Sequence, residues 1–375
     1  MKKCCCVDLR ATNEEVITLA LMDQPTYVEG FHDPEAVKKM TYHPFGNTGL
    51  KVSKMSLGGG PLGGIYGDTI ETESIQTVHL AVKSGINYID TAPYYGNGRS
   101  EEVIGKALKD VPRRAYYIAT KVGRYEFAIE RMFDFSAERV ERSVERSLKL
   151  LGLDYVDVIQ VHDLEFAESL DIVLKETLPA LKKVVEQGKA RFIGITGYNV
   201  SVLKEVVERS SVKIDLVLSY ARNTMIDDTL KEYLPFFQSR GIGVINAAAV
   251  GMGMLCQERD LVAWHPAPQE MKTACEAARD YCEAAGVDLG RLAVQHSLAL
   301  EGLATHLLGC INLDILKRNL QSVLVPLTPL EEQVARDVVD RFFQPLPKKH
   351  WEGVEPAKFW KKFRELQGET HKEEN

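Results

Sequence analysis

The 375-residue chain lacks a long hydrophobic run. Its longest uncharged stretch, residues 241–257, has 17 residues and contains four glycines, whereas a membrane-spanning helix needs about 20 apolar residues. The first residues are basic, but Asp8 and Glu14 interrupt the apolar segment that a signal peptide would need. The sequence therefore predicts a cytoplasmic protein without a membrane span.

The chain also lacks an excess of positive charge. It has 46 Lys and Arg residues against 53 Asp and Glu residues, a net charge of −7. Nucleic-acid binding depends on basic surfaces, so this balance argues against a nucleic-acid partner. Hydrophobic residues make up 45% of the chain and charged residues 26%, which indicates a folded globular protein and not a disordered one.

Cysteine is sparse and unpatterned. Seven cysteines include no Cys-x-x-Cys pair, so they fit neither a disulfide framework nor a zinc site. His162 and His265 lack neighbours at ligand spacing, and we expect no metal. The triplet at residues 4–6 leaves open acylation or a disordered tail. The other cysteines are expected to be reduced thiols: Cys256, Cys275, Cys282 and Cys310.

Beyond residue 41, short apolar runs rich in β-branched and aromatic residues alternate with segments of helical periodicity. In residues 137–151, for example, valines and leucines recur every three or four residues while charges occupy the other face. The predicted strands are residues 54–59, 87–90, 115–121, 155–162, 191–196, 214–219, 243–247 and 306–309. The predicted helices are residues 73–84, 101–109, 137–151, 170–187, 202–209, 228–240 and 270–285.

This alternation predicts an α/β fold, because strands that alternate with helices pair in parallel and place the helices outside. Eight such units within residues 41–326 match a single (β/α)₈ TIM barrel, which typically needs about 250 residues. A doubly wound sheet is the alternative. Residues 58–63 do fit its G-x-G-x-x-G fingerprint, but Gly64 and Gly67 follow where a helix should begin. We therefore interpret the glycines as a strand-to-helix loop.

The barrel is predicted to span residues 41–343, between an N-terminal extension of residues 1–40 that we expect to be loosely ordered and a C-terminal tail of residues 344–375. A hairpin cap is predicted around residues 47–49, where the sequence is Asn-Thr-Gly. A spacing of four residues between apolar side chains predicts a last helix on the barrel wall. These side chains are Leu330, Val334, Val338 and Phe342. The aromatic tail is expected to fold back toward the mouth of the barrel or toward a partner subunit.

Candidate catalytic residues follow three neighbouring predicted strands. Asp90, Lys121 and His162 end these strands, and Tyr95 follows Asp90 by five residues. In a TIM barrel the reactive groups come from the carboxyl ends of the strands. A lone Asp or His there is more often a cap or a core residue. A buried Lys, however, needs a charged partner, and Asp90 can be that partner. The combination indicates one shared site.

These four residues resemble the catalytic tetrad of the aldo-keto reductases, and the likeness covers nearly all of residues 43–325. Within that superfamily the chain is most similar to the L-galactose dehydrogenases. The segments that carry this likeness are residues 123–125, 133–140, 162–166, 194–197 and 264–267. The resemblance implies an enzyme that transfers hydride between a substrate carbon and NAD or NADP.

The tetrad has a physical logic of its own. Tyr95 must accept a proton from the substrate when a carbinol is oxidised, and a phenol with a pKa near 10 is a poor base at neutral pH. We therefore expect its pKa to be lowered by Lys121, which Asp90 holds in place, while His162 orients the substrate oxygen. The expected reaction is oxidation of the C1 hydroxyl of an aldose to a lactone, with Tyr95 as general acid and base.

The resemblance implies that the cofactor lies extended across the barrel mouth. Gly251 and Gly253 permit close backbone approach to the pyrophosphate, and a helix that begins near Asn312 offers free N–H groups to a phosphate. The residues implied in cofactor binding are Gly59, Gly60, Asp90, Thr196, Ser219, Ala247, Val250, Gly251, Gly253, Gly309, Asn312 and Asn319.

Some positions depart from the family pattern. Family members that prefer NADP carry Lys, Ser and Arg where this chain has Gly309, Cys310 and Ile315. A 2′-phosphate needs a cationic clamp, so we expect NAD to be preferred over NADP. Lys317 and Arg318 lie one turn further on and leave NADP open. In addition, Ala247 and Gly197 replace an aromatic ring and an Asn that many members carry.

The expected partner is a sugar or a small carbonyl compound. Tyr66, Tyr125 and Trp264 fall in loops at the mouth and are candidate substrate residues, although such aromatics can also simply pack the loops. Two alternatives stay open: a carbonyl or aldehyde reductase of broad specificity, and a regulatory subunit of potassium channels with the same fold. The sequence does not indicate the oligomeric state.

Overall fold

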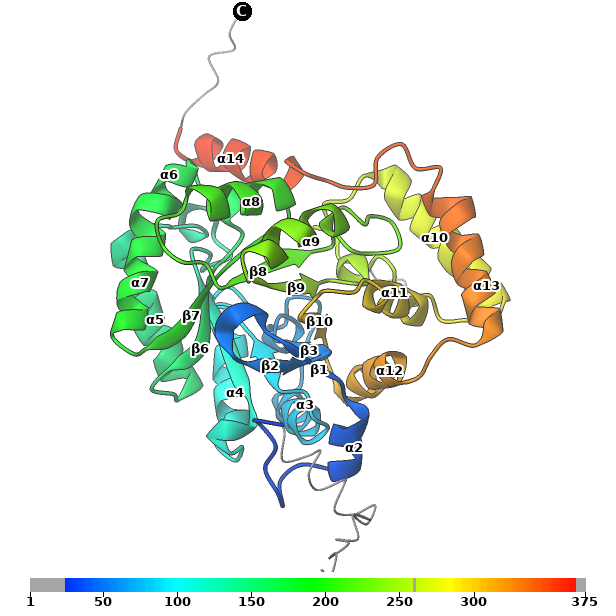
Figure 1. Ribbon diagram of the computed structural model, residues 1–375. Helices are drawn as coiled ribbons and strands as arrows, with labels where there is room; N and C mark the ends of the chain where they lie inside the picture. Colours follow the sequence, from blue (N-terminus) through cyan, green and yellow to red (C-terminus); the bar gives the residue numbers. More distant parts are fainter. Residues whose placement is uncertain (1–23, 259–260, 369–375) are drawn as a thin grey trace, which may run out of the picture.

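The computed structural model of the protein describes residues 24–258 and 261–368. Eight parallel strands close a barrel in the order β10-β3-β4-β5-β6-β7-β8-β9, with the helices around it (Figure 1). The predicted (β/α)₈ barrel is therefore confirmed. The strands are β3 (Met55–Gly58), β4 (Tyr88–Asp90), β5 (Tyr117–Val122), β6 (Val156–Val161), β7 (Ala190–Gly197), β8 (Leu216–Tyr220), β9 (Gly243–Ala247) and β10 (Thr305–Gly309).

Local signals mark both ends of helix α5. The Ser136 side chain caps α5 by accepting from the Arg139 N–H, and Gly152 ends it in the left-handed conformation. The helices are α2 (Pro34–Lys39), α3 (Glu71–Lys83), α4 (Arg99–Leu108), α5 (Ala137–Leu151), α6 (Leu170–Ile172), α7 (Leu178–Glu186), α8 (Val200–Arg209), α9 (Leu230–Ser239), α10 (Gln269–Ala284), α11 (Leu289–Leu298), α12 (Leu313–Leu324), α13 (Pro329–Val338) and α14 (Val354–Leu366).

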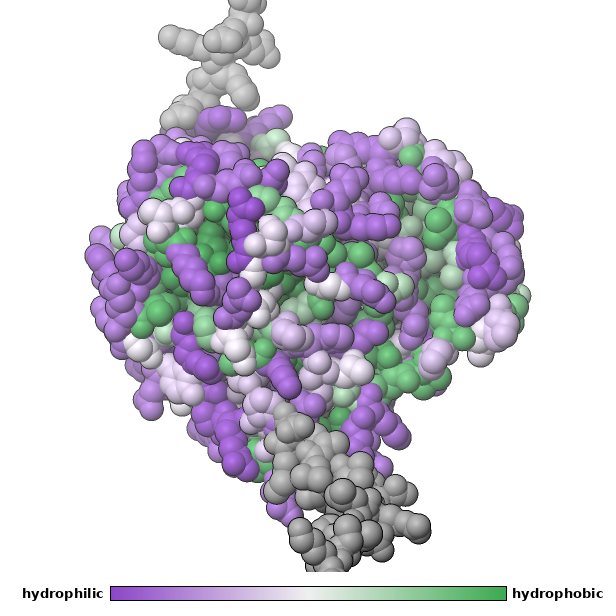
Figure 2. Space-filling model, in the orientation of Figure 1, coloured by the Kyte–Doolittle hydropathy of each residue, from purple (hydrophilic) through white to green (hydrophobic). Residues whose placement is uncertain are grey.

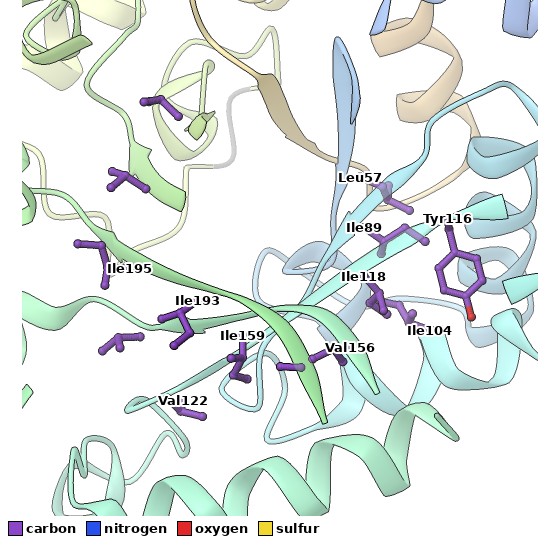
Figure 3. Packing of buried hydrophobic residues seen from close by; sticks show 14 of the residues in the cluster. Leu57, Ile89, Ile104, Tyr116, Ile118, Val122, Val156, Ile159, Ile193 and Ile195 are labelled. Carbon is purple, nitrogen blue, oxygen red and sulfur yellow. The ribbon is translucent and has the colours of Figure 1, made fainter. Parts of the chain in front are cut away.

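Successive strand residues face opposite sides of the barrel wall. Ile89, Ile118 and Ile159 pack in the core between strands and helices (Figure 3). Their neighbours Tyr88 and Ala119 belong to a second buried cluster with residues of the hairpin cap. Tyr88 and Ala119 therefore face the inside of the barrel. Asp90 and Lys121 each lie two residues further along the same strands, so their side chains face the inside as well.

The predicted hairpin cap is confirmed. Strand β1 (Tyr42–Pro44) pairs antiparallel with β2 (Lys51–Ser53), and the short helix η1 (Gly46–Thr48) joins them. The Phe45 ring meets the Tyr88 ring edge-on at 5.1 Å. A Cβ on Gly46 would lie 2.3 Å from the Gly243 backbone N, so only glycine permits this close approach. The cap thus covers the end of the barrel away from the strands' carboxyl ends.

The described part of the N-terminal extension, residues 24–40, packs against the barrel. The Asn87 amide donates to the Thr26 hydroxyl at 3.0 Å, and Val37 of α2 is buried. Asp33 caps α2 through the N–H groups of its first turn. The candidate acylation site at Cys4–Cys6 lies outside the described residues, and the domain boundaries at 40 and 343 stay predictions.

Two helical segments differ from the predictions. The single helix predicted over 170–187 is broken by a π-helical turn, η6 (Val173–Thr177), because Pro179 lacks the N–H that a continuous α-helix needs. Helix α11 was not predicted, although Asp288 caps it through the Arg291 N–H. Helices α10 and α11 therefore both lie between β9 and β10.

The last predicted helix is confirmed as α13, but the prediction of which of its residues are buried was partly wrong. Val334 and Val338 are buried as expected, whereas Leu330 is 58% exposed. A π-helical turn, η8 (Val339–Phe343), follows α13 and shifts the buried position by one residue. Phe343 is therefore buried in place of the expected Phe342.

The aromatic tail folds back over the carboxyl ends of the strands. The Trp351 N–H donates to the Tyr198 hydroxyl at 3.0 Å, and the two rings stack with centroids 4.6 Å apart. Phe359 of α14 meets Phe133 edge-on at 4.9 Å. Figure 1 shows α14 lying across the same end of the molecule as α8. The tail thus adds a layer above the loops that follow β6 and β7.

The visible surface of the molecule is mainly hydrophilic over the outer helices, with smaller apolar areas between them (Figure 2). Among the helices of the described ranges, none is both long and apolar enough to cross a membrane.

Candidate active site

The structure brings the four predicted catalytic residues together at the carboxyl ends of the strands. Lys121, 1% exposed, forms an ion pair with Asp90 and donates to the Thr91 carbonyl at 2.9 Å. The same ammonium lies 3.3 Å from the Tyr95 hydroxyl. The rings of Tyr95 and His162 are perpendicular, with centroids 5.5 Å apart. A substrate oxygen could therefore meet both the phenol and the imidazole.

A fifth polar residue completes the support of the buried ion pair. The Gln160 amide donates to the second Asp90 carboxylate oxygen at 2.6 Å. Gln160 lies two residues before His162 on β6, so the period of the strand places it on the same inner side. Both Asp90 oxygens are thus bonded, which fixes the carboxylate and through it the Lys121 ammonium.

The expected direction of the Tyr95 pKa shift was wrong. Burial raises the pKa of Tyr95 above its ordinary value, and the Lys121 charge opposes this rise without reversing it. The burial of the phenol could not be seen in the sequence. For Lys121, burial lowers the pKa, but Asp90 and Tyr95 outweigh it, so the pKa is raised and the ammonium stays charged. The phenol is therefore protonated and the lysine cationic at neutral pH.

His162 is held as a neutral imidazole. Burial, together with the Lys121 and Arg124 charges, lowers its pKa well below the ordinary range. Its Nδ1 is buried and has no hydrogen-bond partner among the described residues. Neutral imidazole can donate or accept one hydrogen bond at each nitrogen, so His162 can orient a substrate oxygen without charge.

The residues implied in binding the nicotinamide end surround the tetrad. Ser219, fully buried at the end of β8, has a hydroxyl without a hydrogen-bond partner in the described part of the chain. The Thr196 hydroxyl accepts from the Asp163 N–H at 3.0 Å. The Gly59 N–H donates to the Asp90 carbonyl at 2.7 Å. A Cβ on Gly60 would come within 3.9 Å of the Tyr95 ring, so Gly60 lies beside the phenol.

The residues implied in binding the phosphates lie on the next two loops. Ala247 ends β9, Val250 precedes the short helix η7 (Gly251–Gly253), and both glycines have positive φ, +57° and +98°. A Cβ on Gly251 would meet the Met254 side chain at 3.5 Å and one on Gly253 the Leu261 side chain at 3.8 Å, which is ordinary van der Waals contact, so the positive φ angles and not a lack of space favour glycine here. The unpartnered Ser219 hydroxyl is a buried polar group that a bound dinucleotide could contact.

The residues implied in binding the adenosine end of the cofactor lie where β10 ends and α12 begins. The Asn312 side chain accepts from the Ile315 N–H at 2.9 Å and caps α12. The Asn319 amide donates to the Gly309 carbonyl at 3.3 Å. Asn312 and Asn319 therefore shape this turn whether or not they also touch a cofactor.

The cationic groups near this turn are few and partly engaged. Arg318 forms an ion pair with Glu258 at 2.6 Å, and Lys317, 64% exposed, lies 3.9 Å from Asp314. Cys310 is fully buried, and burial raises the pKa of its thiol to about 12. Cys310 thus packs the turn and does not present a polar group to a phosphate.

Of the three candidate substrate residues, two lie at the mouth. Tyr66 and Trp264 are 38% and 51% exposed, and their ring centroids are 5.9 Å apart. Tyr66 also lies beside Tyr95, because a Cβ on Gly60 would be within 3.9 Å of both rings. These two aromatics form one side of the entrance to the tetrad.

The expectation for Tyr125 was wrong. Its side chain is 1% exposed, and the Arg139 guanidinium of α5 lies 4.3 Å from its ring centroid. Gly123 has a φ of +98°, so the chain turns sharply after β5 and directs Tyr125 toward α5 instead of the mouth. Tyr125 therefore packs the loop.

Sequence reasoning missed an ion pair next to the tetrad. Arg124 pairs with Asp163 at 2.6 Å, and its guanidinium lies 3.8 Å above the Tyr94 ring. Asp163 has a φ of +48° and a carboxylate oxygen 3.7 Å from His162 Nε2. Arg124 follows Lys121 by three residues, and Asp163 directly follows His162. This position just beyond two strand ends of the tetrad is the signal from which the sequence could have indicated the pair.

Comparison with known proteins agrees with this geometry. The model of the aldo/keto reductase family matches residues 54–336. The chain belongs to the aldo/keto reductase family. It is 41% identical over 320 residues to L-galactose dehydrogenase of Arabidopsis thaliana, a match that covers 84% of this chain and 97% of the relative.

Two further relatives support the assignment. D-arabinose 1-dehydrogenase of Saccharomyces cerevisiae is 31% identical, covering 66% of this chain and 76% of that one. The solved holo form of an aldo-keto reductase of Bacillus halodurans superimposes with a TM-score of 0.65 at 30% identity, over 80% of this chain and 96% of that one. The chain is therefore an oxidoreductase of a family that uses NAD(P)H cofactors.

Proposed function

We propose that this aldo/keto reductase oxidises the C1 hydroxyl of an aldose of the L-galactose type to a lactone. The observation that carries the proposal is the contact of Lys121 with both Asp90 and Tyr95, with the neutral His162 imidazole beside the phenol. The similarity to two sugar dehydrogenases, one of them a D-arabinose 1-dehydrogenase, favours a sugar over a simple aldehyde.

The reaction needs one proton and one hydride to leave the substrate. The bound oxidised nicotinamide would supply the hydride acceptor and a positive charge. Tyr95 accepts the proton of the C1 hydroxyl as the C1–H bond breaks, and Lys121 stabilises the phenolate through its ammonium. His162 holds the same oxygen through a hydrogen bond. The Asp90 carboxylate and the Gln160 amide keep Lys121 in position.

Because burial raises the Tyr95 pKa, the two reaction directions should depend on pH in opposite ways. Oxidation needs the phenolate, so its kcat/KM should increase with pH through the alkaline range. Reduction needs the protonated phenol, so its kcat/KM should decrease over the same range. A pH profile that moves in the same direction for both reactions would contradict the role of Tyr95.

We further propose that NAD is preferred over NADP. Gly309, Cys310 and Ile315 offer no cation to a 2′-phosphate, and the nearby Arg318 is paired with Glu258. A phosphate would therefore compete with Glu258 for Arg318, and it would meet Lys317 only as an exposed side chain that lies 3.9 Å from Asp314.

A substrate panel tests the proposal. The purified protein is assayed with L- and D-aldoses and with NAD or NADP, and the product is analysed for the lactone. We expect NADH formation with L-galactose-like aldoses and a higher kcat/KM with NAD than with NADP. Rapid reduction of simple aldehydes without aldose oxidation would instead select the broad reductase, and a higher kcat/KM with NADP would overturn the cofactor preference.

A further inference from the structure

A cavity of about 220 Å³ lies beneath the C-terminal tail, next to the tetrad and separate from it. It is bounded by the loop after β6, the start of α8, the end of β8 and the residues before and at the start of α14. None of the residues implied in cofactor binding lines it. Its lining includes four aromatic rings and two carboxyl groups: Phe166, Tyr198, Tyr220, Trp351, Glu165 and Glu355.

The two carboxyl groups of the cavity are held by the surrounding backbone and rings. Glu165 accepts from the Tyr198 N–H at 2.6 Å, while its other oxygen is buried without a hydrogen-bond partner among the described residues. A Cβ on Gly197 would lie 2.5 Å from that oxygen, so Gly197 leaves the room it occupies. Glu355 accepts from the Trp351 indole at 3.2 Å and from the Tyr220 hydroxyl at 3.4 Å.

The Arg124–Asp163 ion pair connects the cavity with the reaction centre. Asp163 lies 3.7 Å from His162 Nε2 on the tetrad side. On the cavity side, the Arg124 guanidinium lies 5.6 Å from the centroid of the Phe166 ring. The charges of both residues also act on the pKa of Glu355. The ion pair therefore lies between the reaction centre and the cavity.

The chemistry of the lining fits hydroxyl groups on a short carbon chain. Aromatic faces pack against C–H groups, and carboxyl oxygens accept hydrogen bonds from hydroxyls. Burial, with the Asp163 charge, raises the pKa of Glu165 to about 8, so this carboxyl can also donate at neutral pH. The Arg124 charge and the protonated Glu165 disfavour a cation. The volume is below the roughly 300–1,000 Å³ of drug-sized sites, so only part of a small molecule fits.

We propose that this cavity is the subsite for the hydroxyl-bearing end of the substrate, away from C1, and that Glu355 and Glu165 bind its hydroxyls. The inference rests on the proposed function, because it assigns the far end of the same aldose. An apolar aldehyde would leave the second Glu165 oxygen without a hydrogen-bond partner and would add no hydrogen bond to Glu355, so the subsite selects polyhydroxylated substrates.

The test compares a hydroxylated and an apolar aldehyde of the same length in the reducing direction. The full-length protein and its variants Glu355→Gln and Glu165→Gln reduce arabinose and pentanal, and KM and kcat are measured separately. The matched control is Glu365→Gln, the same change on the exposed end of α14. Thermal melting verifies that each variant is folded.

We expect Glu355→Gln to lower kcat/KM for arabinose about 10-fold, through KM, because a hydrogen bond to a charged carboxylate is replaced by a weaker bond to a neutral amide. The value for pentanal should change less than about 2-fold, and Glu365→Gln should change neither. We expect Glu165→Gln to act in the same direction. An equal loss for both aldehydes, or no loss for arabinose, would overturn the subsite.

A binding measurement separates this inference from the proposed function. L-Galactose is titrated into the wild-type protein and Glu355→Gln, and tryptophan fluorescence is followed, since Trp351 lines the cavity. We expect a saturable change in the wild type and at least about 10-fold weaker binding in the variant. If the wild type binds L-galactose in this way but does not oxidise it, the proposed function fails and the subsite stands. Equal binding by both proteins, or no binding by the wild type, contradicts the subsite.

Discussion

Four residues of the proposed site lie at the ends of adjacent strands: Asp90, Lys121, Gln160 and His162. Two others lie outside the strands, Glu165 in a loop and Glu355 in the C-terminal tail. The first group, the strand half of the site, is at most 4% exposed and is fixed by the pairing of β4, β5 and β6. The second group, the loop half, depends on contacts such as that of Trp351 with Tyr198. The difference suggests that the strand half determines the chemistry and the loop half the choice of substrate.

The largest expected effect is that of Tyr95→Phe. Because this change removes the proton-transferring hydroxyl, we expect kcat to fall about 10²- to 10⁴-fold for every substrate. Stopped-flow or steady-state assays with an aldose and with an aldehyde measure it. The matched control is Tyr94→Phe, since the neighbouring Tyr94 ring packs on Arg124, whereas the Lys121 ammonium contacts the Tyr95 hydroxyl. Full activity of Tyr95→Phe would remove Tyr95 from the mechanism.

Lys121→Met should affect both stability and activity. It leaves Asp90 buried without its ion-pair partner, and breaking such a pair costs about 3–5 kcal/mol of unfolding free energy. Denaturant unfolding measures this loss. Arg209→Met serves as the control, because its pairs with Glu205 and Asp171 are exposed to solvent and should contribute far less to the free energy of unfolding. Similar losses for the two variants would contradict the account of the strand half.

Ile315→Arg should change the cofactor preference without affecting the tetrad. It adds a cation at the first turn of α12, beside Asn312. We expect kcat/KM for NADP to rise relative to NAD by about 10-fold, the effect of one charge-assisted hydrogen bond. Kinetics with both cofactors measure the ratio, and Ile315→Met controls for side-chain length. An unchanged ratio would mean that the adenosine end lies elsewhere.

Glu165→Gln should have a smaller, pH-dependent effect on stability. Burial, Asp163 and Glu355 raise the Glu165 pKa from 4.5 to about 8. Between these values the folded state holds the extra proton, so wild-type stability falls as pH rises through this range. Glutamine does not titrate. We therefore expect the Tm of the variant, relative to that of the wild type, to be higher at pH 8.5 than at pH 5.5. A pH-independent difference in Tm would contradict the buried, protonated carboxyl.

The contrast between the two halves also explains what could be predicted from the sequence. Parallel strands end at the same edge, so Asp90, Lys121 and His162 could be brought together from strand ends alone. Glu355 lies far along the chain on the aromatic tail, which was expected to fold back toward the mouth or a partner subunit, but no local pattern indicates which of its side chains meets the loops. Tyr125 was placed at the mouth because the sharp turn at Gly123 was not foreseen. The direction of the Tyr95 pKa shift depends on burial, which only the folded structure shows.

The central claim is that Tyr95, held by the strand half, accepts the proton of the C1 hydroxyl of an aldose while the C1 hydride passes to the nicotinamide. The most direct measurement uses L-galactose labelled with deuterium at C1, incubated with NAD and the wild-type protein. We predict that the deuterium appears in the reduced nicotinamide, that the sugar is recovered as its lactone, and that Tyr95→Phe abolishes both. Reduced nicotinamide without deuterium, or no oxidation of the sugar by an enzyme that reduces aldehydes rapidly, would contradict the claim.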